Sequence, residues 1–470
     1  MRLAFKEIRL IASIVLVGVI FWVASAPASA QPYAVPPTWG GDFWTRPRLT
    51  GDWGGLRDDL GKKGVVFDVD VLVTPMDVLS GGKSTGGDTW GNADYTLNVD
   101  TQKLGLWPGG FLNISVDTSF GSALTNSGAL VPVNTATLIP ESNAHTTALM
   151  GATFMQFLST KFGLILGKVD TLASAKLEFY GDYQTQFLNA AFNFPLTSAF
   201  VPISAFGGGV IALPTEDINV SLLALGSNGT PTNNNVGDAF SKGTMVVGSG
   251  ALTIKPWGLV GHQNLSVLWS SQDRFSLEQD PANLAALLLQ SRFPRLGDPG
   301  PILEQILMRF FPGLVSPVPP NHESSSWAVG YAFDQYLWQP AGDPKQGIGV
   351  FFSMGASDAN PNPIKYAFLA GLGGKGMVPG RPNDTFGLAF ARTQFSSAFV
   401  PFLRQRLDLG LEHEDSFEAY YNLAITGWLS ATADLQVVNP GLKKALNSPG
   451  ASLMNVDTAV IAGIRFRVRF

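Results

Sequence analysis

Charged and amide side chains recur at every second position in several apolar segments of this 470-residue chain. Arg465, Arg467 and Arg469 alternate with large apolar residues at the C-terminal end, and Asp68 and Asp70 do the same near the start of an earlier segment. Carboxylates, guanidinium groups and amides on one surface offer both hydrogen-bond donors and acceptors. Such a surface suits a neutral solute rich in hydroxyl groups, whereas a ring of one charge sign would select ions.

This alternation predicts β-strands with one apolar face and one polar face. Arginines between large apolar residues fit a wall with lipid on one side and water on the other. An amphipathic edge strand of a soluble protein is the alternative, and a register shift of one residue would reverse every assignment. The candidate solute-path residues on the polar faces are Asp70, Asp94, Asn98, Asp117, Glu418, Asn422, Asp434, Arg465 and Arg467.

Sixteen such strands can be placed between residues 65 and 470, so we predict an all-β, transmembrane antiparallel barrel of about 16 strands. Long and short connections alternate along the chain, as they do in outer-membrane barrels. The long connections are expected near 74–93, 120–150, 170–208, 226–243, 272–324, 356–364, 393–417 and 439–455. Residues 272–324 form the longest extracellular loop, and its 277–315 part has helical spacing. Residues 31–64 are expected to be a periplasmic segment with a short helix within 50–63, capped by Thr50 or Asp52.

Residues 1–30 have the basic start, apolar run and small-residue end of a secretory signal peptide, with cleavage expected near Ala30. The chain has no cysteine, so disulfides do not hold the exported protein together. Its net charge of -5 argues against a nucleic-acid partner. The four histidines show no metal-ligand spacing, and no nucleophile motif is present, so we expect no cofactor, no metal and no enzymatic activity.

Four segments resemble the carbohydrate-selective porins of the OprB type. They are LTGDWGGLRDDLGKKGV (49–65), LGKVDTLASAKLEFYGDYQTQFLNAAFNFP (166–195), LAGLGGKGMVPGRPNDTFGLAFART (369–393) and FEAYYNLAITGWLSATADLQVVNP (417–440). The resemblance implies a 16-stranded barrel through which monosaccharides diffuse. The insert around 277–320 departs from the family pattern. A final aromatic residue, here Phe470, also resembles the ending that the barrel-assembly machinery of outer membranes reads.

The connection 170–208 is the candidate constriction loop, because it places hydrogen-bonding groups among aromatic rings. Its candidate residues are Glu178, Tyr180, Asp182, Tyr183, Gln184 and Asn189. The resemblance supports this placement, since a loop of this kind folds into the lumen of related porins. The alternative is that the rings pack the loop onto the wall and touch no solute.

The sequence therefore predicts an outer-membrane channel of a Gram-negative bacterium for passive diffusion of small sugars and similar solutes. Its expected partners are the solute, outer-membrane lipid and the assembly machinery, and a homotrimer is expected by analogy of fold. A general or cation-preferring diffusion porin is one alternative, because the lumen residues include several aspartates. A non-conducting surface barrel, such as an adhesin, is another.

Overall fold

The computed structural model describes Tyr33, Arg309, Pro401, Arg404 and the ranges 35–141, 145–172, 177–234, 236–280, 319–343, 345–399, 408–446 and 453–470. The predicted signal peptide and nearly all of the expected helices of 277–315 lie outside the described residues.

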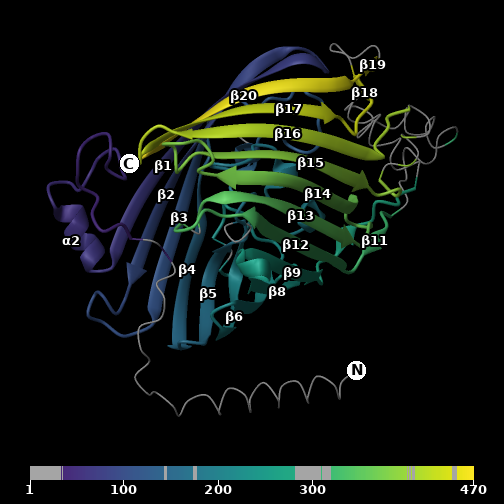
Figure 1. Ribbon diagram of the computed structural model, residues 1–470. Coiled ribbons are helices and arrows are strands. Elements are labelled where there is room, and N and C mark those ends of the chain that lie inside the picture. The colour runs from purple at the N-terminus through teal and green to yellow at the C-terminus, as the bar shows by residue number, and fades with distance from the viewer. Residues whose placement is uncertain are drawn as a thin grey trace, which may run out of the picture.

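The described residues form a closed antiparallel barrel of sixteen strands, which confirms the predicted fold class. Figure 1 shows these strands as one slanted wall around a lumen. The barrel strands are β1 (Val65–Gly82), β2 (Gly86–Asp100), β3 (Gly110–Gly121), β4 (Thr147–Ser159), β5 (Phe162–Asp170), β6 (Ser204–Thr215), β7 (Ile218–Gly226), β8 (Thr244–Ile254), β9 (Gly261–Ser270), β12 (Ser326–Trp338), β13 (Gly347–Ser357), β14 (Ile364–Lys375), β15 (Thr385–Phe395), β16 (His413–Ala424), β17 (Leu429–Asn439) and β20 (Asp457–Arg469).

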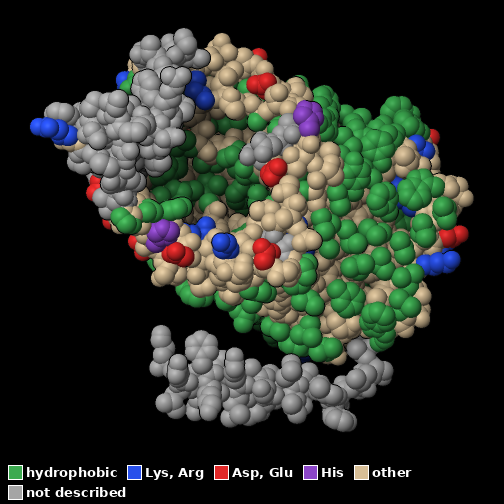
Figure 2. Space-filling model, turned by 180° about the vertical axis from the view of Figure 1, so that it is seen from behind, with side chains coloured by type: hydrophobic (Ala, Val, Ile, Leu, Met, Phe, Trp, Pro, Cys, Tyr) green, Lys and Arg blue, Asp and Glu red, His purple; other side chains and the backbone are tan. Residues whose placement is uncertain are grey.

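Side-chain alternation along the strands separates the lumen from the lipid face. On β17, Asp434 and Gln436 are buried inside the barrel, whereas Leu435 and Val437 on the other face are exposed. On β20, Arg465 is buried while Ile464 is exposed on the outer wall. Figure 2 shows hydrophobic side chains covering the outer wall and a hollow at one end of the molecule. This separation is what a wall between lipid and water requires.

Long and short connections alternate as predicted around most of the barrel, with two exceptions at 83–85 and 358–363, because each is shorter than the connections predicted to be short beside it. The β3–β4 loop (122–146), the β5–β6 loop (171–203) and the connection 271–325 leave one rim, whereas turns such as 160–161 and 216–217 lie on the other. The expected long loop at 74–93 is wrong, because β1 and β2 continue through it and only residues 83–85 join them. Pro75 and the glycines of this stretch hid the alternation, although their backbones still pair in register.

Shorter elements precede the barrel or lie in the connections between its strands. They are α2 (Leu56–Lys62), the 3₁₀ turns η1 (Thr135–Leu138), η2 (Ala190–Phe192), η3 (Leu196–Ser198) and η4 (Pro256–Gly258), and the strand pairs β10 (Arg274–Phe275) with β11 (His322–Glu323) and β18 (Lys444–Leu446) with β19 (Leu453–Asn455). In Figure 1, α2 lies at the same end as the C-terminus, and β11, β18 and β19 lie at the opposite end.

The predicted N-terminal helix exists, but it is shorter than expected and is capped differently. Gly55, in a left-handed conformation, is the N-cap of α2, and no side chain caps the helix, so neither Thr50 nor Asp52 has that role. Gly64, also at positive φ, leads into β1 where a Cβ atom would lie 2.9 Å from the Cβ of Asp100. A glycine is therefore required between the helix and the barrel.

Exposed tryptophans lie near both ends of the barrel. Trp269 and Trp327 pair across β9 and β12 near the rim with the long loops, and Trp107, Trp257 and Trp338 lie near the other rim. Tryptophan prefers the two membrane–water interfaces, so these rings mark the edges of the lipid-facing band. Among the described residues, no helix has the length and apolar character needed to cross a membrane.

Candidate functional site: the loop-lined lumen

The β5–β6 loop folds into the barrel and forms the largest hydrophobic cluster there. Phe179, Tyr180 and Phe187 are buried with Tyr336 of β12 and Phe351 of β13. The ring centroids of Phe179 and Tyr336 are 4.8 Å apart, and those of Tyr180 and Phe351 are 4.9 Å apart. For these three loop rings, the structure supports packing onto the wall rather than contact with a solute. The expectation that Tyr180 lines the solute path is therefore corrected.

Glycines on the inner wall make room for this loop. A Cβ atom at Gly373 of β14 would lie 2.9 Å from the Cβ of Phe179, and one at Gly387 of β15 would lie 2.7 Å from the Phe187 ring. These distances are shorter than ordinary carbon–carbon contacts. The loop side chains therefore approach the wall backbone more closely than a residue with a Cβ atom at these two wall positions would permit.

Wall carboxylates bind the loop through its backbone. Glu418 of β16 accepts hydrogen bonds from the N–H groups of Leu188 and Asn189, and the Asn189 side chain donates to Gln436 Oε1 at 3.2 Å. Glu418, Asn189 and Gln436 have no exposed surface. Two of the predicted solute-path residues, Glu418 and Asn189, are thus placed together as loop anchors and away from the open lumen.

Two other predicted residues are also used inside the wall. Asn422 Oδ1 accepts a hydrogen bond from Thr432 at 2.9 Å, and Asp434 Oδ1 accepts one from Gln436 at 2.9 Å. Both side chains are buried, at 4% and 6% exposure. Their inward direction was predicted correctly, but neither offers its polar group to a solute in this arrangement.

Glu178 lies at the part of the wall formed by β12, in a cluster with Asp334 and Tyr336. Its backbone N–H donates to Asp334 Oδ2 at 2.9 Å, and its carboxylate accepts a hydrogen bond from the Tyr336 hydroxyl at 2.7 Å. His262 of β9 lies 2.7 Å from the other oxygen of Asp334. The loop is therefore attached to the wall at its beginning as well as at Asn189.

The turn at residues 182–186 is the part of the loop that reaches across to β2. Asp182 accepts hydrogen bonds from the N–H groups of Gln184 and Gln186, which closes the turn on itself. The Gln184 amide donates to Asp94, and the Tyr183 hydroxyl donates to the same carboxylate at 3.4 Å. Burial raises the pKa of Tyr183, and the Asp94 charge raises it further, so this hydroxyl stays protonated and able to donate. Asp182, Tyr183, Gln184 and Asp94 are therefore brought together.

A row of charges continues from the turn along the β1 side of the barrel. Arg469, Asp70, Asp94 and Asp117 stand directly opposite one another on the adjacent strands β20, β1, β2 and β3. Arg467 Nη2 lies 2.6 Å from Asp70 Oδ2. Like charges directly opposite repel, while the arginines offset part of that repulsion on one side only.

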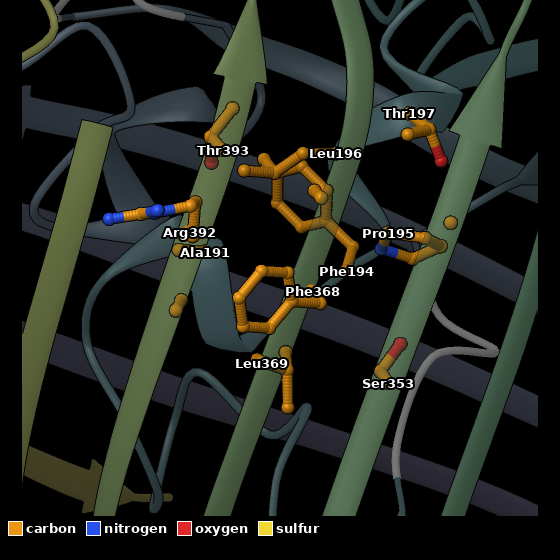
Figure 3. Close-up of a pocket in the computed structure, with 13 residues that line it drawn as sticks. Ala191, Phe194, Pro195, Leu196, Thr197, Ser353, Phe368, Leu369, Arg392 and Thr393 are labelled. Atoms are coloured by element: carbon orange, nitrogen blue, oxygen red, sulfur yellow. The ribbon is translucent and has the colours of Figure 1, made fainter. Parts of the chain in front are cut away.

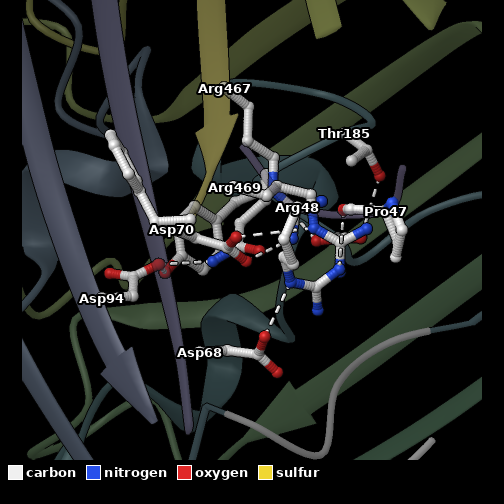
Figure 4. A network of polar contacts seen from close by, with 12 residues as sticks. Pro47, Arg48, Asp68, Asp70, Asp94, Thr185, Arg467 and Arg469 are labelled. Atoms are coloured by element: carbon white, nitrogen blue, oxygen red, sulfur yellow. Dashed lines mark hydrogen bonds and ion pairs between the residues drawn. The ribbon is translucent and has the colours of Figure 1, made fainter. Parts of the chain in front are cut away.

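Arg48, from the N-terminal segment, joins this row and was not predicted. Its Nε atom lies 2.6 Å from Asp68 Oδ1, and Figure 4 shows it beside Arg469, with Asp70 and Arg467 in the same network. The alternation argument could not find Arg48, because it lies outside any strand. On β2 and β3, Asn113 donates to Asn98 Oδ1 at 2.8 Å, so the predicted Asn98 faces the lumen in a pair of amides.

The β3–β4 loop is a second element inside the barrel that sequence reasoning missed. Glu414 of β16 accepts hydrogen bonds from the N–H groups of Leu130 and Val131 at 2.8 and 2.9 Å. Asn92 of β2 donates to the carbonyl of Ile139, on the opposite side of the same loop. The sequence signal for such an anchor is a glutamate at an inward-facing position of a strand, as Glu414 is on β16.

A small cavity separates the returning part of the β5–β6 loop from the wall. Figure 3 shows Phe194 and Leu196 of the loop beside Phe368 of β14, while the Arg392 side chain of β15 points away from them. The cavity is lined mainly by apolar groups and belongs to the seat of the loop. Among the described residues, no group of three or more histidine, aspartate or glutamate side chains is placed to hold a metal ion.

Comparisons with known proteins agree with this architecture. The family model described as "Carbohydrate-selective porin, OprB family" matches residues 84–470. OprB of Pseudomonas putida at high pH superimposes with a TM-score of 0.71 and 20% identity, over 92% of this chain and 100% of that chain. The low-pH structure of the same protein gives a TM-score of 0.54 and 16% identity, over 91% and 99% of the two chains. These likenesses concern the fold.

One curated relative also matches in sequence. Porin B of Pseudomonas aeruginosa is 26% identical over 159 residues, which are 31% of this chain and 32% of that protein. The match thus spans about a third of the relative's length. The family match covers most of the chain and the barrel is closed, which together place the protein in a Gram-negative outer membrane as a channel-type protein. The chain belongs to the OprB family of carbohydrate-selective porins.

Proposed function

We propose that this protein lets monosaccharides and similar small hydrophilic solutes diffuse passively across the outer membrane. The observation that carries the proposal is the turn at 182–186, which is held inside a closed barrel against a wall of both charge signs. A fixed internal turn narrows the passage, and a narrow passage lets the lining groups contact each solute molecule.

Mixed charge favours a neutral solute over an ion. Asp70 is paired with Arg467, and Asp68 with Arg48, so these charges cancel locally. The remaining donors and acceptors of Tyr183 and the Asn98 amide can exchange hydrogen bonds with sugar hydroxyls as they do with water. We assign the solute path to Asp70, Asp94, Asn98, Asp182, Tyr183, Gln184 and Arg467. We assign Asp117, which is buried like Asp434, to the inner wall together with Glu178, Asn189, Glu418, Asn422, Asp434 and Arg465, which hold the loop and wall.

A cation-preferring channel is the second candidate, because Asp94 and Asp117 stand opposite each other with arginines only on the far side of Asp70. Zero-current potentials in a KCl gradient separate the two functions. A sugar channel gives a potential near zero together with glucose flux into liposomes. A cation channel gives a large potential of the sign for potassium, and a non-conducting surface barrel gives no flux of either.

The remaining parts of the proposal concern export and assembly. We propose that the signal peptide is removed near Ala30, that Phe470 is read by the barrel-assembly machinery, and that the protein forms a homotrimer without a cofactor or enzymatic activity. The N-terminal sequence of the purified protein tests the first of these. Light scattering in detergent tests the oligomeric state, with a monomer mass as the contradicting result.

A further inference from the structure

We propose that Arg465 and Glu418 are positioning residues that set the width of the passage by holding the loop backbone on both sides of residue 187. The inference rests on the proposed function, since it assigns the control of the same constriction. Neither side chain touches the open lumen, because they are exposed by only 1% and 0%. Each acts through the loop alone.

Arg465 binds carbonyl groups of the loop backbone, and Glu418 binds N–H groups of the same backbone. Arg465 Nη1 donates to the carbonyl of Tyr183 at 2.7 Å, and Arg465 Nη2 donates to the carbonyl of Gln186 at 2.8 Å. Glu418 accepts from the N–H groups of Leu188 and Asn189. A guanidinium group therefore holds the carbonyls before residue 187, and a carboxyl group holds the N–H groups after it. Hydrogen bonds to charged groups are the stronger kind.

Because the turn is internally hydrogen-bonded, fixing its backbone also fixes the residues that face the passage. The N–H groups of Thr185 and Gln186 donate to the carbonyl of Asp182, so residues 182–186 move as one unit. Fixing the carbonyls of Tyr183 and Gln186 then fixes the side chains of Tyr183 and Gln184, which extend to Asp94 on β2. The wall at β16 and β20 thereby determines how far the turn reaches toward β2.

Geometry explains why an arginine is needed at this position. Its planar fork can donate to two carbonyls in fixed directions, and a second bond from Nη2 to Thr432 Oγ1 at 2.9 Å orients the fork. A lysine keeps the charge but donates as a point, so it can hold one carbonyl well and the other poorly. The conservative variant Arg465→Lys is therefore expected to fall between the wild type and Arg465→Ala.

Single-channel recording tests the proposal, because it reads only channels that have folded and inserted. Arg465→Ala and Glu418→Gln are expected to open a state of higher conductance about tenfold more often than the wild type, equivalent to about 1.4 kcal/mol. Glu216→Gln, in the exposed turn after β6, is the matched control and should behave as the wild type. If neither Arg465→Ala nor Glu418→Gln opens this state more often than the wild type, the proposal is overturned.

A second measurement does not depend on conduction. The chain has no cysteine, so Leu188→Cys supplies a single thiol at a site that is 1% exposed. Thiol labelling of this variant reports how often the loop leaves the wall, and Arg465→Ala is expected to raise its rate about tenfold. Wild-type channels that conduct without glucose block would refute the sugar assignment alone. Equal labelling rates with and without Arg465 would refute the positioning role alone.

Discussion

Replacing Gly355 of β13 by alanine tests whether the returning part of the β5–β6 loop is seated tightly on the wall. A Cβ atom there would lie 2.3 Å from Thr197 Oγ1, on the loop, and 3.2 Å from the carbonyl oxygen of Val329. The Gly355 backbone has no left-handed φ, so crowding is the whole cost of the substitution. Extra atoms in a packed site cost about 1–3 kcal/mol, which raises the undocked fraction of the loop about 5- to 150-fold.

A double-mutant cycle assigns this cost to the contact with the loop. The Thr197 hydroxyl is buried and has no hydrogen-bond partner, so Thr197→Ala removes the crowded atom without breaking a bond. The Cβ of Thr197 would remain 3.4 Å from the new methyl group, which is an ordinary contact. The double variant should therefore lose the part of the cost that comes from Thr197 Oγ1 and keep only the part from the Val329 carbonyl, with a coupling of about 1 kcal/mol or more between the two positions.

The assay is the labelling rate of Leu188→Cys, combined with thermal unfolding in detergent. Gly250→Ala on β8 is the control, because a Cβ atom at Gly250 has no neighbour within 4 Å. Two results would refute the reasoning. One is a Gly355→Ala variant that labels as slowly as the control, and the other is a double variant that keeps the full cost of Gly355→Ala.

The other predictions concern the pairing of β1 with β20, a periplasmic turn and ion selectivity. Arg57→Ala should lower the unfolding free energy by about 1–3 kcal/mol, because the buried Arg57 donates hydrogen bonds to the carbonyl of Phe67 on β1 and, at 3.0 Å, to that of Phe470 just after β20. Thermal unfolding measures this change. Burial raises the pKa of Asp384, but hydrogen bonds, foremost from Arg381, outweigh it and hold that pKa below its ordinary value. The ionised Asp384 therefore stabilises the fold above about pH 4, and this stabilisation is lost as the pH falls through the lowered pKa. The unfolding temperature of Asp384→Asn, measured as a function of pH, should therefore fall less below about pH 4 than that of the wild type. Asp94→Asn should shift the zero-current potential in a KCl gradient away from potassium, and an unchanged potential would remove Asp94 from the solute path.

The barrel could be predicted from the sequence because side-chain parity is a local property. β20 shows this most clearly, since each arginine faces inward where the alternation placed it. The two strands of the first hairpin were predicted but not their full length, because the part that pairs beyond Thr74 includes Pro75, Gly86 and Gly87, whose side chains carry no alternating apolar signal. Their pairing depends on backbone hydrogen bonds that the neighbouring strands complete.

The inward direction of the candidate site residues follows from the sequence, but their partners inside the barrel do not. Parity put Glu418 inside the barrel, yet nothing in its own strand shows that two N–H groups of a loop some 230 residues away use both of its oxygens. Arg48 was missed for the same reason, because its position depends on the N-terminal segment packing against β1 and β20. Contacts between distant segments decide which inward residues face solvent.

Single-channel conductance of the refolded protein in planar bilayers, with glucose titrated in, tests the central claim most directly. We expect steady conductance steps that glucose blocks in a saturable way, because the turn at 182–186 forces each sugar molecule into contact with the lining groups. Steps that glucose leaves unchanged would contradict a sugar site in the passage. The absence of any steps would contradict the channel itself.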